Sequence, residues 1–425
     1  MDRSTRRRLT RSALAIAGVV VVLAVVTWWA GRFLARSQVV VLPAPSLVPV
    51  LAAAPTPGGI GLEAVAMAPP PTHAPDEREI CGAGWFRLNL DGSPQGDPKD
   101  IAARLDLANA RRSVLDALRA DPANSARAAA LLVEALNADD RQRASAPRRP
   151  PCEGAGCPAS EPRDDGHALL ERLAERAAES TDPQLYGYAL RSCGHARSEP
   201  GTCALLSAAQ WTRLDPGNAE PWLQILGTAM ATGDAAGRDE ALHRIATADR
   251  DATYGFVMAR VIAEHAPPGD KAQTAAWVLA GEALGVEAAW TVQYQGVSSA
   301  CSGTALDDAN RRQTCAAIAE LLVARSDDIL ARAIGTGLGV RLGWSPDRID
   351  LLRGQYRAFQ RDTMTVESRS SGLPCEQVRS ELDAWRRKGT LGETGVLREW
   401  IAASGRSDAE FIALERERRD ASAGR

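Results

Sequence analysis

Residues 12–30 form a run of 19 positions without one ionisable side chain, between Arg11 and Arg32. As an α-helix this run rises about 28 Å, close to the thickness of the hydrocarbon core of a bilayer. Trp28 and Trp29 lie at its far end, where indole rings favour the headgroup boundary. We therefore expect residues 12–30 to be a transmembrane helix with these four residues at the membrane interfaces.

The charges around this span are asymmetric. Residues 1–36 hold seven arginines and one acid, whereas the rest of the chain holds 43 basic and 52 acidic side chains, so the net charge of −3 divides into +6 and −9. Positive flanks stay in the cytoplasm, which predicts that residues 1–11 are a cytoplasmic flank and that the remainder is exported. We expect a single-pass protein of a bacterial inner membrane with a periplasmic C-terminal domain.

Two alternatives for the N-terminus stay open. A cleaved signal peptide has a shorter apolar region and a small-residue cleavage site, but residues 31–36 have the sequence GRFLAR, which favours an uncleaved anchor. The sequence TRRRL at residues 5–9 resembles a twin-arginine export signal.

A linker is predicted over residues 31–76, because residues 37–76 contain nine prolines and almost no charge. Proline favours extended conformations, so the linker would hold a domain away from the bilayer. A Pro-rich ligand for a partner domain is the alternative function of this segment.

Residues 77–425 are predicted to be one all-α domain. Apolar residues recur three and four positions apart from Asp100 onward, with charged side chains between them. The only candidate strand is the weakly alternating GWFRLNL at residues 84–90, and residues 139–166, rich in Arg, Pro, Ser and Gly, are predicted to be a polar loop. Tryptophans recur through the helical region and are expected to fill the cores of helical hairpins.

A stretch of small, aromatic and turn residues repeats near the middle of the domain. Residues 203–249 have the sequence CALLSAAQWTRLDPGNAEPWLQILGTAMATGDAAGRDEALHRIATAD. Together with the preceding helix, this stretch resembles two tetratricopeptide repeats, each a helix-turn-helix unit of about 34 residues. The resemblance covers residues 185–252 and implies helical hairpin repeats, arranged as an α-solenoid or as an irregular helical array.

The resemblance assigns core positions within the two repeats. The expected repeat-core residues are Tyr188, Ala204, Trp211, Trp222, Ile225 and Ala241. Relatives that clamp a peptide carboxylate present Lys, Asn and Arg on their concave face. The matching positions here are Tyr186, Ala189, Cys193 and Ala196 in one unit and Glu220, Leu223, Gly227 and Met230 in the next. This surface is mostly apolar and small, so it suits packing against another helix better than clamping a carboxylate.

Eight cysteines follow the predicted span, and an even number in an exported domain indicates disulfides. Two similar cassettes place Cys193 and Cys203, and Cys301 and Cys315, on either side of polar loops before apolar helices. We predict that each pair forms a disulfide, each worth roughly 2–3 kcal/mol by loop entropy.

The other four cysteines pair less directly. Cys152 and Cys157 are closest to each other in sequence, which leaves Cys81 and Cys375 as the least certain pair. Zinc binding is the alternative, but C-x4-C without a neighbouring histidine is poor ligand spacing, so no metal site is predicted.

A search for catalytic motifs finds none. The five histidines form no HExxH, and His195 beside Cys193 is better explained as a loop residue next to a disulfide. The acids of residues 307–308 and 327–328 lie where carboxylates cap helices, and residues 335–339, GTGLG, are expected to be a flexible joint between helices.

We therefore predict no catalytic residue, no cofactor and no small-molecule ligand. The acidic exported region also argues against nucleic-acid binding, which needs a basic face. The expected function is a membrane-anchored scaffold or protein-interaction module of the cell envelope, with a protein partner that the sequence does not identify. The alternative is an envelope hydrolase or transferase with an unrecognised site in the helical domain.

Overall fold

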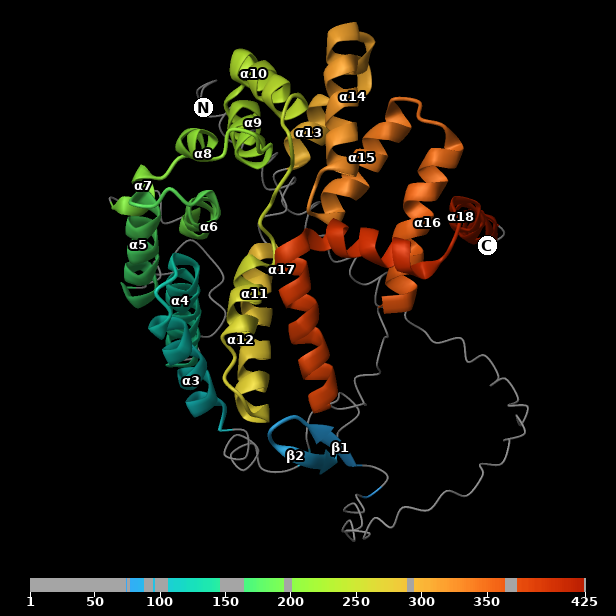
Figure 1. Ribbon diagram of the computed structural model, residues 1–425. Helices are drawn as coiled ribbons and strands as arrows, with labels where there is room; N and C mark the ends of the chain where they lie inside the picture. Colours follow the sequence, from blue (N-terminus) through green and yellow to red (C-terminus); the bar gives the residue numbers. More distant parts are fainter. Residues whose placement is uncertain are drawn as a thin grey trace, which may run out of the picture. The chain divides into compact units, whose positions relative to one another are not determined.

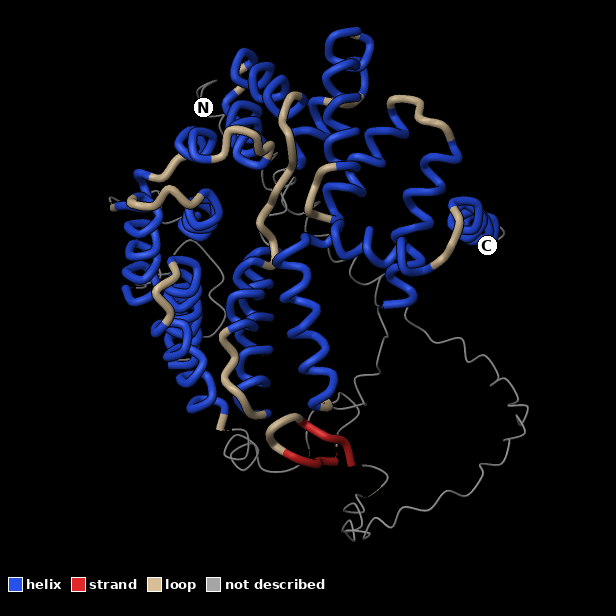
Figure 2. The backbone as a smooth tube through the Cα atoms, viewed as in Figure 1, coloured by secondary structure: helices blue, strands red, loops and turns tan. Residues whose placement is uncertain are grey.

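The computed structural model describes residues 74, 77–87, 95, 106–145, 164–194, 201–288, 294–363 and 373–423. By compactness the chain divides into Met1–Pro70 and Pro71–Arg425, and every described residue belongs to the second unit. Helices dominate this unit (Figures 1 and 2). The all-α class that the sequence predicts is therefore confirmed for the described residues.

The described elements are a β-hairpin followed by a long series of helices. A hairpin of β1 (Glu77–Ile80) and β2 (Gly84–Arg87) comes first. The helices that follow are α3 (Leu107–Ala120), α4 (Asn124–Ser145), α5 (Asp164–Ala178), α6 (Pro183–Cys193), α7 (Thr202–Leu205), α8 (Ala208–Leu214), α9 (Glu220–Thr232), α10 (Ala235–Ala246), α11 (Val257–Glu264), α12 (Asp270–Ala288), α13 (Gln295–Ala300), the 3₁₀ helix η3 (Gly303–Asp307), α14 (Ala309–Ala324), α15 (Ile329–Arg341), α16 (Pro346–Thr363), α17 (Cys375–Ser404) and α18 (Asp408–Ala423).

The β-hairpin includes the strand candidate from the sequence. β2 pairs with β1 in antiparallel register, with Glu77 opposite Arg87 and Ile80 opposite Gly84. Gly82 has φ of +77°, a conformation that glycine adopts readily in a tight turn. β1 was not predicted, because the four residues EREI show too little apolar alternation.

One apolar core joins α3–α6, α8, α11, α12 and the first part of α17. Figure 1 shows α11, α12 and this part of α17 side by side, and α11 packs on both of the others. Trp211 of α8 is the largest side chain that this core encloses completely. Trp277 and Trp385 are half-buried at its edge and stack with 6.3 Å between ring centroids.

A second core lies among α9, α10, α13, α14 and α15. Leu223 and Leu226 of α9 and Ile318 of α14 are fully buried in it. Beyond this core, α16 packs against α18 so closely that a Cβ atom on Gly354 would collide with the Phe411 carbonyl group.

A polar seam of loops runs between elements of the two cores. Asn218 pairs with Arg250 and Asp251 with Ser326 in isolated parallel bridges. The Asn218 side chain is fully buried, donates to Ala252 O at 2.9 Å and accepts from Ala252 N at 2.8 Å. These backbone contacts stack loops that are distant in sequence, just before α9, α11 and α15 begin.

Three cysteine pairs are joined as disulfides in the structure. Cys193 is bonded to Cys203, Cys301 to Cys315 and Cys81 to Cys375, with Cα–Cα distances of 5.5, 5.7 and 4.5 Å. The first two are the pairs that the cassette spacing predicts, and the third is the least certain pair, which was left by elimination. Cys152 and Cys157 lie outside the described residues. The bond from Cys81 to Cys375 ties the β-hairpin to the first residue of α17.

Some sequence predictions need correction. Residues 335–339 are not a flexible joint but lie inside α15, because Gly335 lets α15 approach α14 until a Cβ would be 2.9 Å from Ala319 O. Ala204 is exposed rather than in a repeat core, since α7 ends at Leu205 after only four residues. The ends of the predicted polar loop are also helical, because α4 continues to Ser145 and α5 begins at Asp164.

The predicted membrane anchor lies outside the described residues, together with its interface residues Arg11, Trp28, Trp29 and Arg32. Within the part of the chain that the structure does describe, none of the helices combines the length and apolar character needed to cross a bilayer.

Candidate functional site

A surface trough runs beside α9 and has a volume of about 900 Å³. Its walls come from α6, the connection from α7 to α8, α9 and α13. Leu190, Leu206 and Leu223 lie along it and are themselves almost completely buried. The other lining residues are Arg191, Ser207, Ala208, Gln224, Gly227, Thr228, Met230, Ala231, Gln295, Gly296 and Ser299. The trough thus combines buried leucines with small and polar side chains, and Arg191 is its one charged lining residue among the described residues.

Small residues keep the trough open. A Cβ atom on Gly227 would meet no atom within 4 Å, so this position of α9 faces free space. On the opposite wall, Gly296 lies so close to α9 that a Cβ there would be 3.1 Å from Leu226 Cγ. The two glycines therefore differ in role, because Gly227 leaves room for a ligand and Gly296 brings α13 close to α9.

The trough contains three of the four positions on the second predicted concave face. Leu223, Gly227 and Met230 line it, whereas Glu220 is fully buried behind it. The corresponding positions of the first unit do not form a surface, because Tyr186, Ala189 and Cys193 are buried. Ala196 lies outside the described residues.

The predicted repeat-core residues mostly occupy core positions. Tyr188, Trp211 and Ala241 are at most 1% exposed, and Trp222 and Ile225 are partly buried against the second core. Ala204 is the exception described above. α9 and α10 form a clean helical pair, whereas the helix expected after α6 is divided into α7 and α8.

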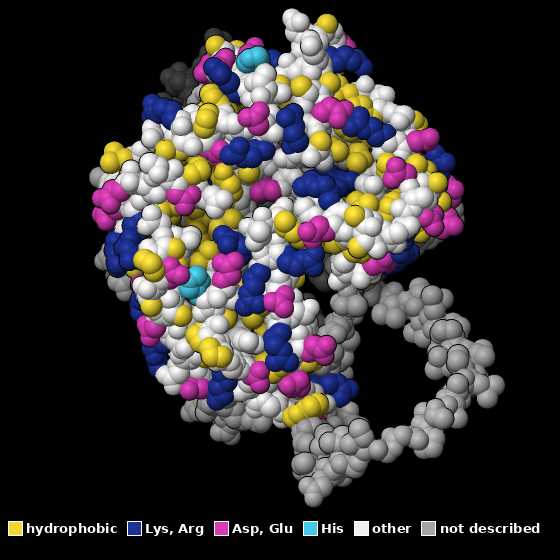
Figure 3. Space-filling view, in the orientation of Figure 1, with side chains coloured by type: hydrophobic (Ala, Val, Ile, Leu, Met, Phe, Trp, Pro, Cys, Tyr) yellow, Lys and Arg dark blue, Asp and Glu magenta, His cyan; other side chains and the backbone are white. Residues whose placement is uncertain are grey.

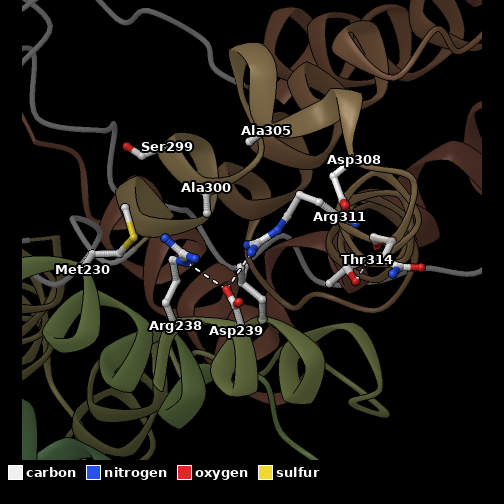
Figure 4. A pocket seen from close by; sticks show the side chains of 11 residues that line it. Met230, Arg238, Asp239, Ser299, Ala300, Ala305, Asp308, Arg311 and Thr314 are labelled. Atoms are coloured by element: carbon white, nitrogen blue, oxygen red, sulfur yellow. Dashed lines mark hydrogen bonds and ion pairs between the residues drawn. The ribbon is translucent and has the colours of Figure 1, made fainter. Parts of the chain in front are cut away.

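A polar pocket of about 580 Å³ adjoins the trough and shares Met230 and Ser299 with it. Figure 4 shows Arg238 and Arg311 reaching toward the Asp239 carboxylate from different helices. Asp239 Oδ1 accepts from Arg238 Nε at 2.9 Å and from Arg311 Nη2 at 2.6 Å. Hydrogen bonding from Arg238 is the main reason why the pKa of Asp239 is lowered, with Arg311 acting in the same direction. Arg311 Nη1 is buried and has no hydrogen-bond partner within the described part of the chain.

Arg191, a lining residue of the trough, forms a buried ion pair with Glu220. Arg191 Nη1 donates to Glu220 Oε1 at 3.1 Å, and Arg191 Nη2 donates to Thr253 O at 2.8 Å. The side chains are 4% and 0% exposed. Burial raises the pKa of Glu220 to about 7, and the positive charge of Arg191 limits this rise.

Further buried acids surround this pair in the polar seam. Asp327 accepts from Thr253 N at 2.8 Å and Thr253 Oγ1 at 3.0 Å, and Asp251 accepts from Tyr294 Oη at 3.1 Å. Burial raises the pKa of Asp251 and of Asp327, and it raises the pKa of Glu287 to about 7. The seam therefore concentrates carboxyl groups whose charged forms are destabilised by loss of water.

Two helix-capping predictions from paired acids are confirmed. Asp308 accepts from Arg311 N at 2.7 Å at the start of α14, and Asp328 accepts from Leu330 N at 2.7 Å at the start of α15. Asp327 instead accepts hydrogen bonds from Thr253, which fix the loop before α11. Sequence reasoning missed this role because the two residues are 74 positions apart.

The chemistry available at these sites favours binding over catalysis. Glu220 and Asp251 have perturbed pKa values but are completely enclosed, so a substrate could not touch them. Cys81, Asp270 and Cys375 lie close enough together to suggest a metal site, yet the two cysteines are bonded to each other and offer no thiolate. His195 lies outside the described residues.

Figure 3 shows basic and acidic side chains interspersed with hydrophobic ones over one face.

Comparison of the chain with known proteins finds no matching family model, no matching curated protein and no matching solved structure.

Proposed function

We propose that this protein is a membrane-anchored scaffold of the cell envelope, which binds a partner protein in the trough beside α9. The observation that carries the proposal is the trough itself. It combines the buried leucines Leu190, Leu206 and Leu223 with an open wall at Gly227. Such a groove suits the apolar face of a partner helix.

The resemblance to tetratricopeptide repeats supports this choice of surface. Leu223, Gly227 and Met230 are positions where the repeat family presents its ligand-binding face, and α9 with α10 has the helix-turn-helix form of one repeat. The finer fold assignment, an α-solenoid or irregular array of such hairpins, belongs to this proposal.

The adjoining pocket adds polar specificity to an apolar groove. Arg238 and Arg311 are both directed at Asp239, and the Arg238 side chain is 35% exposed, so its guanidinium group can also reach a partner. We expect the partner helix to present an apolar stripe to the trough and an acceptor group, such as a side-chain amide or a carboxylate, to the pocket.

The proposed location rests on the sequence. The uncharged span of residues 12–30, with most positive charge before it, supports an inner-membrane anchor with a cytoplasmic N-terminus. Disulfides persist in oxidising compartments, so the three bonded cysteine pairs support a periplasmic domain.

A glycine substitution tests the trough without disturbing the core. Gly227→Arg places a long side chain in the open space, and replacing a helical glycine should not weaken α9. Gly281→Arg is the matched control, because Gly281 of α12 also has no atom within 4 Å of a Cβ. The full chain would be crosslinked in cells and its captured proteins identified. The proposal predicts one specific partner, retained by G281R and lost by G227R. A partner profile that is identical for all three proteins would refute it.

A hydrolase or transferase remains the alternative function. The buried positions of Glu220 and Asp251 do not favour it, because neither acid can reach a substrate from the polar seam. Turnover of an envelope substrate by the purified chain, together with an unchanged partner profile in G227R, would favour this alternative.

A further inference from the structure

A small hollow with an excess of positive charge lies among α3, α4 and α5. It has a volume of about 270 Å³ and is smaller than a typical pocket for a drug-sized ligand. Its lining residues are Arg119, Arg127, Ala130, Leu131, Glu134, Arg172 and Arg176. Four guanidinium groups therefore face one carboxylate, in an exported region that is acidic as a whole.

The single carboxylate of the hollow, that of Glu134, already forms an ion pair. Arg119 Nε donates to Glu134 Oε1 at 2.9 Å, and Arg119 Nη2 lies 2.6 Å from the same oxygen. Arg119 also contacts Asp116 at 3.1 Å. Glu134 thus neutralises Arg119 and leaves the charges of Arg127, Arg172 and Arg176 uncompensated within the hollow.

None of these three arginines forms an ion pair with another residue of the described ranges. The carboxylate of Asp121 acts electrostatically on Arg127, but its oxygens already bind His265 Nε2 at 2.8 Å and Ala123 N at 2.7 Å. The Asp121 carboxylate is therefore engaged outside the hollow.

Two features of these positions work against helix stability, although Arg176 itself lies in the last turn of α5, where the helix dipole favours a cation. Arg172 and Arg176 are four residues apart on α5, where like charges cost roughly 0.2–0.5 kcal/mol. Arg127 lies in the first turn of α4, where the helix dipole disfavours a cation. A bound anion would relieve both effects at once.

We propose that this hollow binds a phosphate group, held by Arg127, Arg172 and Arg176. Guanidinium groups match phosphate geometry, because their planar donors form paired hydrogen bonds to two oxygens. Three positive charges suit a group that carries up to two negative charges and at least two free oxygens. The buried side chains of Ala130 and Leu131 complete the lining and leave recognition to the arginines. This inference is independent of the trough beside α9.

The phosphate group could belong to a free phosphate compound or to a lipid headgroup. Isothermal titration calorimetry of the purified full chain, at fixed ionic strength set with sodium chloride, distinguishes them. One arm uses inorganic phosphate, and the other uses glycerophosphoglycerol, the headgroup of an anionic phospholipid. Saturable binding of either probe supports the site, and the tighter probe identifies the source.

Substitutions test whether binding occurs in this hollow. Arg172→Gln combined with Arg176→Gln, and Arg127→Gln on the neighbouring helix, should each weaken binding at least tenfold. Arg312→Gln, at an exposed arginine of α14, is the matched control and should leave affinity unchanged. Without phosphate, the double variant should melt at the wild-type temperature or slightly above it, which shows that the fold is intact. Absence of saturable binding by both probes, or equal affinity in the wild type and the double variant, would overturn the proposal.

Discussion

The guanidinium group of Arg191 on α6 meets the carboxylate of Glu220 on α9 at 3.1 Å, where both side chains are almost completely shielded from water. Removing one partner from such a pair leaves the other charge buried and uncompensated. This relationship links the two helices whose side chains also line the trough.

Arg191→Met should therefore destabilise the domain by roughly 3–5 kcal/mol at pH 8. The loss should be smaller at pH 5, because Glu220, whose pKa burial raises to about 7, then takes up a proton. The double variant Arg191→Met, Glu220→Met should recover most of the stability, since it leaves no charge behind. Urea unfolding at the two pH values measures these differences.

The control for this pair is Glu240→Gln, which breaks an exposed pair between Arg244 and Glu240 on α10, with both side chains 54% exposed. Its effect should stay within about 0.5 kcal/mol. Equal losses in R191M and E240Q would show that the buried pair has no special role.

Glu287 should make the domain less stable as pH rises. Burial raises its pKa from 4.5 to about 7, against the effect of the hydrogen bond from Phe256 N. The native state therefore holds this proton more tightly than the unfolded chain, so its contribution is complete below about pH 4.5 and is lost as pH rises through about 7. The free energy of unfolding of Glu287→Gln, measured relative to wild type, should rise by roughly 1–3 kcal/mol from pH 5 to pH 8.

Urea unfolding at pH 5 and pH 8 measures this difference in the pH dependence of the free energy of unfolding. Glu376→Gln, at an exposed acid of α17, should keep the wild-type pH dependence. The assignment is wrong if E287Q and wild type lose equal stability over this range.

The long-range disulfide should contribute more than the local ones. Cys81 and Cys375 are 294 residues apart, whereas Cys193 and Cys203 are 10 apart. Loop entropy predicts a loss of roughly 5 kcal/mol for the double alanine variant of the first pair and roughly 3 kcal/mol for the second. Denaturation without reductant should give this order, and the reverse order would contradict the entropic explanation.

Gly354 should be essential for docking α18 on α16. In Gly354→Ala the new methyl group would collide with the Phe411 carbonyl group, so α18 should become sensitive to limited proteolysis. Gly337→Ala in α15 meets no atom within 4 Å and should instead stabilise its helix by roughly 0.5–1 kcal/mol. Equal cleavage of α18 in both variants would show that the close contact between Gly354 and Phe411 does not hold α18 on α16.

Local features of this fold were predictable from the sequence, whereas contacts between distant loops were not. Cys193 and Cys203 lie at the ends of neighbouring segments, so their spacing alone indicates the bond. Asp328 follows the ordinary pattern of a helix cap. The role of Asp327 depends on Thr253 in another loop, and no periodicity in the sequence brings the two together.

The candidate sites show the same division. Leu223, Gly227 and Met230 recur at helical spacing, so the face that they share could be predicted. The opposite wall at Gly296, and the arginine hollow, depend on helices that meet only in the folded chain. Residues 335–339 mislead because glycine marks loops in sequence, while in α15 it permits close helix packing.

A photo-crosslinking amino acid at Thr228 tests the central claim most directly. Thr228 is exposed on the trough wall, and its hydroxyl donates back to Gln224 O at 3.1 Å. Thr390 is the matched control, because it is also exposed on a helix and bonds back to Arg386 O at 2.9 Å. We predict one specific adduct in cells from position 228, absent at position 390 and lost when Gly227→Arg is added. Identical adducts from both positions, or no adduct at position 228, would contradict the assignment of the trough as the partner-binding surface.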